Sequence, residues 1–131
     1  MESELESELE HKLEPKLVWN DLLGMDFDGP HLQWQDFRDG VDTILLHGDA
    51  TQGCSSALLR YHPGARIPEH MHEGMEFLLI LRGSQTDERG HYRAGTFLIN
   101  PTNSTHKILS EEGCVVLAVW EKPVRFIKKQ I

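Results

Sequence analysis

The stretch Gly64-Ala-Arg-Ile-Pro-Glu-His70-Met-His72-Glu-Gly-Met-Glu76 decides how this chain is interpreted. Its two histidines are separated by one residue, and a glutamate follows the second. On a β-strand, side chains alternate between the two faces, so His70 and His72 point the same way; on a helix they would diverge. Neutral imidazoles and a carboxylate form a mixed nitrogen and oxygen ligand set that suits a divalent transition metal. The stretch therefore predicts a metal site built on β-structure.

A second spaced motif, Gly95-x5-Pro101-x4-His106, places another histidine thirty residues after Glu76. Around both motifs, short apolar runs alternate with Gly and Pro turn signals, and no helical stretch lies between them. Many short strands with such turns predict an all-β antiparallel sandwich or barrel. Leu78 and Ile80 share parity with Glu76, and Ile108 with His106, so we expect them to face the interior. The apolar runs lie at 42–47, 55–61, 66–72, 75–82, 84–87, 91–93, 95–100, 106–109 and 114–121.

The chain divides into three parts. Residues 1–16 are heavily acidic and carry a tandem Glu-Ser-Glu-Leu repeat with leucines at positions 5, 9 and 13, which predicts a solvated, disordered tail. The other interpretation of this leucine stripe is a helix that docks onto a partner or a second subunit. Residues 17–40 mix large aromatic residues with turn signals and predict an extended arm packing on the barrel. Residues 41–131 form the predicted barrel.

Composition narrows the function classes. At 131 residues the chain is one ordinary domain, and its formal net charge of −8 argues against nucleic acid or an anionic membrane as a partner. The N-terminus is acidic where a signal peptide would be positive, and no apolar run is long enough to span a bilayer. With only Cys54 and Cys114 present, a disulfide scaffold is excluded. We expect a cytoplasmic protein with reduced thiols.

Both motifs resemble the signature of the cupin superfamily, in which Gly-x5-His-x-His-x3–4-Glu-x6-Gly is followed by Gly-x5-Pro-x-Gly-x2-His-x3-Asn. The chain departs from the second motif at Asn103 and Ser110. Residues 58–68, 87–95, 100–101, 104–106 and 110–114 look more closely like the cupin domain of the ChrR family of anti-sigma factors. The resemblance implies a jelly-roll cupin β-barrel. It also implies one divalent metal per subunit, typically zinc, on the matching residues His70, His72, Glu76 and His106.

Several alternatives stay open at this stage. Glu76 either binds the metal directly, as the family's glutamate does, or orients a histidine or a water from the second coordination shell. Iron, nickel or manganese would also suit the site. Residues 1–40 contain no Cys and lack the matching His pair, so we expect the sigma-clamping zinc domain of the family to be missing. Homodimer formation is the default expectation for a small cupin.

Two functions fit this resemblance. The first is a metal-binding regulatory or sensor module that responds to small molecules or oxidative stress. The second is a mononuclear non-haem metal dioxygenase acting on a small diketone-like or aromatic ketone substrate, and a purely structural zinc barrel is the third and simplest reading. Whether the chain is an enzyme stays undecided, and no catalytic residue is assigned. Arg60 and Tyr61 lie on a strand beside the expected barrel mouth, where either could hydrogen-bond a ligand.

Overall fold

A computed structural model describes residues 17–127. The predicted tail at 1–16 lies outside the described residues. No helix within the described part is long and apolar enough to cross a membrane. The elements in chain order are the 3-10 turn η1 (Leu22–Gly24) and strands β1 (Gln35–Arg38), β2 (Val41–Gly48), β3 (Ser55–Tyr61), β4 (Ala65–His72), β5 (Glu76–Asp87), β6 (Gly90–Arg93), β7 (Phe97–Asn100), β8 (Thr105–Ser110), β9 (Cys114–Trp120) and β10 (Val124–Phe126).

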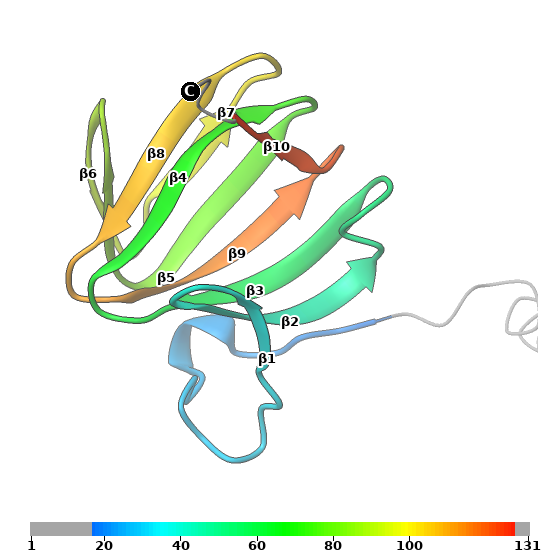
Figure 1. The fold of residues 1–131 in the computed structure, drawn as a ribbon. Helices are drawn as coiled ribbons and strands as arrows, with labels where there is room; N and C mark the ends of the chain where they lie inside the picture. The colour runs from blue at the N-terminus through cyan, green and yellow to red at the C-terminus, as the bar shows by residue number, and fades with distance from the viewer. Residues whose placement is uncertain (1–16, 128–131) are drawn as a thin grey trace, which may run out of the picture.

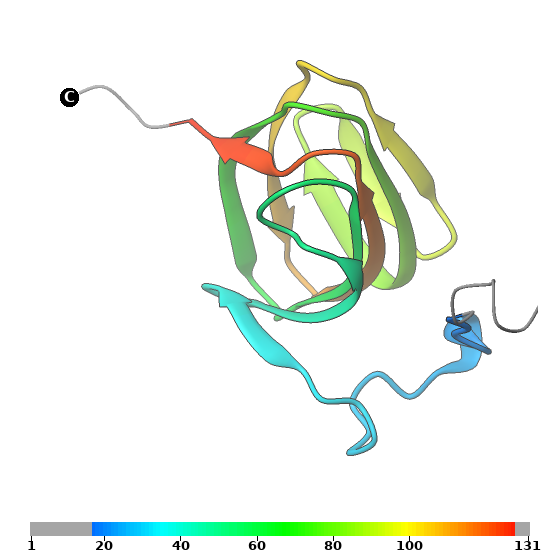
Figure 2. The same ribbon diagram turned by 90° about the vertical axis from the view of Figure 1, so that its right-hand side faces the viewer.

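All strand pairs are antiparallel, and the strands form one curled sheet in the order β1-β2-β3-β9-β5-β8-β4-β10 (Figure 1). Strand β5 holds the curl together: it pairs with β9 and β7 along its first half and with β6 and β8 near its end. The result is a half-barrel with β1 and β10 at the two ends of the strand order (Figure 2). The all-β antiparallel prediction is confirmed.

Two details differ from the predicted strands. The predicted runs 75–82 and 84–87 are one strand, because Gly83 adopts a positive φ of 76° beside an irregularity in the β5–β9 register and lets the strand bend without ending. A side chain at Gly83 would collide with the carbonyl of Gly113. Strand β10 was not predicted, since three residues are too few to show an alternating pattern.

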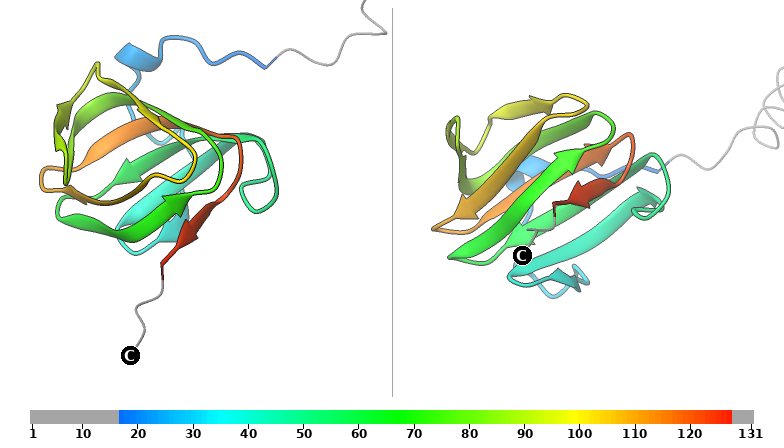
Figure 3. Two further views of the ribbon diagram at one scale, coloured as in Figure 1. Left: turned by 90° about the horizontal axis from the view of Figure 1, so that it is seen from above. Right: turned by 45° about the horizontal axis from the view of Figure 1, so that its top comes forward.

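Apolar residues form two separate clusters, one on each face of the sheet. The inner cluster fills the half-barrel and includes Leu78, Ile80 and Ile108, as their parity predicts. The outer cluster centres on Phe27, which is 2% exposed and packs with Leu58 and Val115 under the N-terminal arm. The arm (blue to cyan) runs along the outside of the sheet (Figures 2 and 3). Most of the arm therefore lies outside the half-barrel, and Phe37 and Arg38 near its end line a cavity in the interior.

Candidate metal centre

A β-bulge in β4 turns the two motif histidines toward the interior. Ala65 and Ile67 point inward at the start of the strand, so simple alternation would send His70 and His72 outward. The register with β8 shifts between Ile67 and His70, at Pro68-Glu69, and this extra residue reverses the parity. His70 then faces His106 directly across the β4–β8 pair.

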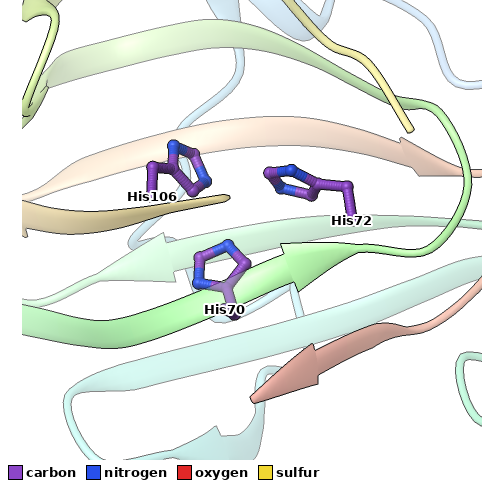
Figure 4. Close-up of side chains that lie close together, drawn as sticks. All are labelled: His70, His72 and His106. Carbon is purple, nitrogen blue, oxygen red and sulfur yellow. The ribbon is translucent and has the colours of Figure 1, made fainter. Parts of the chain in front are cut away.

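The three histidines form one buried cluster (Figure 4). One possible ligand atom from each of His70, His72 and His106 lies within 4.8 Å of the other two. The ring centroids are 4.5 to 5.1 Å apart, and each residue is no more than 3% exposed. The structure thus brings together three of the four residues that the sequence predicts as metal ligands, and their binding of an ion stays a prediction.

Hydrogen bonds at Nδ1 hold each ring in one tautomer. His70 Nδ1 lies 3.0 Å from the carbonyl oxygen of Pro68, which can only accept a hydrogen bond. His106 Nδ1 lies 3.1 Å from a carboxylate oxygen of Asp87. His72 Nδ1 lies 2.9 Å from Ser104 Oγ, whose own hydrogen is donated to the carbonyl of Pro101. Each ring therefore carries a proton on Nδ1, which leaves Nε2 as the nitrogen that can bind a metal ion.

Two ring nitrogens of the histidine cluster lack hydrogen-bond partners. Within residues 17–127, the buried Nε2 atoms of His72 and His106 have no hydrogen-bond partner. Burial, the dominant cause, lowers the pKa of His70 from 6.5 to about 4, so this ring is neutral at physiological pH. Neutral imidazoles with converging lone pairs are the donor set that divalent zinc and related ions prefer. The residues present fit a bound metal ion.

Glu76 completes one side of this cluster. Its Oε1 lies 3.1 Å from His72 Nε2, without the alignment of a hydrogen bond. This is the separation expected for two ligand atoms of one metal ion. Metal–ligand bonds of about 2.0–2.2 Å place neighbouring ligand atoms roughly 3–3.5 Å apart. Glu76 is not part of the mutually close group, which consists of the three histidines.

Glu76 also accepts two hydrogen bonds that were not predicted from the sequence. Asn100 donates to Oε1 at 2.8 Å, and the Trp120 indole donates to Oε2 at 2.6 Å. Burial opposes ionisation of Glu76, but the hydrogen bonds that its carboxylate accepts act against burial and help to lower the pKa of the carboxyl group below its usual value. Glu76 is thus an ionised, buried carboxylate held in one orientation.

Asp87 and Ser104 are further site residues that sequence reasoning missed. Both lie in the segments that carry the family resemblance, but no ligand spacing marks a residue that acts on a histidine through its Nδ1.

Arg60 and Tyr61 are the two residues that the sequence places beside the barrel mouth as possible ligand contacts. Tyr61 lines the cavity at His70, whereas Arg60 points outward and pairs with Asp42 at 2.8 Å.

Residues 27–124 match the family described as the ChrR cupin-like domain. The chain belongs to this family. Its curated relative, the anti-sigma-E factor ChrR of Cereibacter sphaeroides, is 33% identical over 107 residues, which cover 77% of this chain and 49% of the relative. This ChrR-like cupin therefore spans about half the length of that relative.

Solved structures support the same fold. ChrR in the complex with SigE from Rhodobacter sphaeroides is 26% identical to this ChrR-like cupin, with a TM-score of 0.64, and the match covers 91% of this chain and 66% of that one. An acetylacetone dioxygenase from Acinetobacter johnsonii is 15% identical with a TM-score of 0.68, and the match covers 89% of this chain and 84% of that one. At that identity, the second likeness shows the cupin fold alone.

Proposed function

We propose that this ChrR-like cupin holds one divalent metal ion per subunit, with zinc as the first choice, and acts as a regulatory or sensor module. The observation that carries the proposal is the convergence of one possible ligand nitrogen from each of three buried histidines. Among the described residues, Nε2 of His72 and His106 has no hydrogen-bond partner. His70, His72 and His106 would hold the ion, and Glu76 would be the fourth ligand. A closed set of four protein ligands suits a stable zinc site whose state changes when an incoming molecule disturbs it.

The cysteines support a metal-based sensor over a thiol-based one. Cys114 is 2% exposed, and burial raises the pKa of its thiol to about 11. Thiolates are the reactive form of cysteine, so Cys114 is a poor target for oxidants. Cys54 is exposed, with no partner cysteine bonded to it. The metal centre is then the group in the interior through which an oxidant or a small ligand acts.

The anti-sigma name of the relative suggests what such a sensor would control, namely a transcription factor. In this proposal, a change at the metal centre would alter a protein contact. We keep a cytoplasmic homodimer as the expected setting; the subunit number and the regulatory partner are to be measured on the purified protein.

A second function, a metal-dependent dioxygenase, is favoured by one observation. Both carboxylate oxygens of Glu76 already accept hydrogen bonds, from Asn100 and Trp120, and the mutually close donors are the three histidines. That arrangement also suits an ion held by three histidines, with positions left for substrate and oxygen and with Glu76 orienting the site from outside the ligand set.

The substitution Glu76→Gln separates these functions. If Glu76 is a ligand, the neutral amide weakens metal affinity strongly, because a charged donor is lost. If Glu76 acts from the second coordination shell, affinity is largely retained and any turnover changes instead. Glu73→Gln is the matched control, since Glu73 is exposed and pairs with Arg125.

Affinity is measured by competition with a chromophoric chelator, alongside oxygen uptake by the iron-loaded protein with acetylacetone. The sensor proposal expects a large affinity loss in Glu76→Gln, none in Glu73→Gln, and no oxygen uptake. Unchanged affinity in Glu76→Gln together with oxygen uptake on the diketone would overturn it.

A further inference from the structure

A small, partly open cavity lies beside the metal centre. His70 and Glu76 form part of its wall, and the rest is mainly apolar, including Leu78, Ile108 and Val124. The space open to the centres of water-sized molecules is about 40 Å³. Since one water needs about 10–15 Å³ on this measure, the cavity holds about three waters. A ligand of roughly the size of acetate fits this space.

Among residues 17–127, Arg38 is the one arginine or lysine that lines this cavity. It is half-buried at the end of β1, and its guanidinium lies 4.1 Å from the centre of the Phe126 ring on β10. Within residues 17–127, its buried Nε has no hydrogen-bond partner. An arginine normally uses several of its N–H groups, and a buried one left unused is costly. The free donor therefore points to an acceptor supplied by a ligand.

Other arginines on this protein show what Arg38 lacks. Arg60 pairs with Asp42 and Asp28, and Arg82 pairs with Asp28. They border a larger and more open depression outside the barrel, but these carboxylates already occupy their donors. No carboxylate forms an ion pair with Arg38 among the described residues. Its position in the inner cavity thus makes it the better anion receptor.

The charges in the cavity also favour an anion. Glu76 carries one negative charge and Arg38 one positive charge, so they balance in the metal-free protein. With a divalent ion on the histidines, the ion, Arg38 and Glu76 together carry a net charge of about +2, which Asp87 behind His106 reduces to about +1. The surrounding is largely apolar, so these charges are weakly screened. Tyr61 adds a neutral donor, since burial keeps its hydroxyl group protonated by raising its pKa.

We propose that this cavity binds a small monocarboxylate of the size of formate or acetate, with its carboxylate facing Arg38 and its hydrogen or methyl group against the apolar wall. The planar guanidinium matches a carboxylate with two parallel hydrogen bonds. This inference rests on the proposed metal centre for the surplus positive charge, and it names the class of ligand that such a centre would sense. Binding links the two end strands of the sheet, because Arg38 lies on β1 and its stacking partner Phe126 on β10.

The test is saturation-transfer NMR of the acetate methyl group on zinc-loaded and metal-free protein, with acetamide as the neutral analogue and benzoate as the oversized one. Arg38→Met keeps the length and the packing on Phe126 but removes the donors. Arg125→Met is the matched control, because Arg125 lies on the same strand as Phe126, is exposed and pairs with Glu73 outside the cavity. Zinc content is measured on every sample.

The native protein and Arg125→Met are expected to bind acetate, with little binding of acetamide or benzoate. Arg38→Met is expected to bind acetate at least about tenfold more weakly while keeping its zinc, since a charge-assisted pair is lost. Equal acetate binding by Arg38→Met, or no acetate binding by native protein in either metal state, would overturn the proposal. Failure of the native protein to take up zinc would refute the metal centre instead, and Arg38-dependent acetate binding by the metal-free protein would then keep the anion site.

Discussion

Asp87 offers a sharp test of how the histidine tautomers are set. Its Oδ2 accepts a hydrogen bond from His106 Nδ1 at 3.1 Å. Its Oδ1 accepts from the backbone N–H groups of Arg89 at 2.8 Å and Gly90 at 3.2 Å, and from the Tyr92 hydroxyl at 3.2 Å. In Asp87→Asn, the amide oxygen can keep the three Oδ1 contacts, so the turn between β5 and β6 should persist.

The amide nitrogen then faces His106 and can only donate a hydrogen bond. The ring must accept at Nδ1 and carry its proton on Nε2, where the metal lone pair was. Changes to such supporting groups typically lower metal affinity about 10–100-fold, which corresponds to about 1.4–2.7 kcal/mol. We expect a loss in this range when zinc affinity is measured by competition with a chromophoric chelator.

Glu88→Gln is the matched control for this substitution. Glu88 lies in the same turn, is exposed and accepts a hydrogen bond from the Lys107 backbone N–H at 2.9 Å, without touching an imidazole. The substitution Glu88→Gln removes a comparable negative charge near His106 but leaves the tautomer of His106 unchanged. Zinc affinity of Asp87→Asn within twofold of the native value, or an equal loss in Glu88→Gln, would refute the reasoning.

Three further predictions concern stability. Because the pKa of His70 is about 4 in the folded protein and near 6.5 when unfolded, the unfolded chain binds the proton first as pH falls from 6.5 to 4. The metal-free protein should therefore lose about 3 kcal/mol of stability over this interval in urea titrations, and a flat profile would contradict the buried neutral ring. Phe27→Ala should cost about 3–5 kcal/mol while zinc binding persists, because Phe27 packs the arm on the outer face, away from the site; a change in melting temperature of less than a few degrees would show that the arm is not anchored there. Deleting residues 1–16 should leave zinc content and melting temperature unchanged in calorimetry, whereas a large drop or a dimer-to-monomer shift would show that the leucine stripe is packed.

The spacing of the motif residues was sufficient to predict that His70, His72 and His106 lie close together. Strand alternation alone would have been misleading at β4, since Ala65 and Ile67 also face inward. The bulge at Pro68-Glu69 allows both this pair and the two histidines to face inward, and the sequence shows only a proline as a sign of it. The family pattern carried the prediction because it already includes the effect of that bulge.

The supporting contacts could not be predicted for a different reason. Trp120 reaches Glu76 from 44 positions away, and Ser104 reaches His72 from 32, so both depend on how strands pair across the half-barrel. Trp120 packs in the inner core, and its indole N–H also fixes the carboxylate of Glu76. The short strand β10 and the Arg38–Phe126 contact depend in the same way on the closing of the sheet's two ends.

The central claim is that the three histidines hold one metal ion per subunit, and metal content tests it most directly. The protein is purified without chelator or a nickel column and analysed by inductively coupled plasma mass spectrometry, together with His72→Ala and the matched control His62→Ala. His62 is exposed and pairs with Asp42 on the outside. We predict about one ion per subunit for the native protein and for His62→Ala, and almost none for His72→Ala. Full metal retention by His72→Ala, or a native protein without stoichiometric metal, would contradict the account.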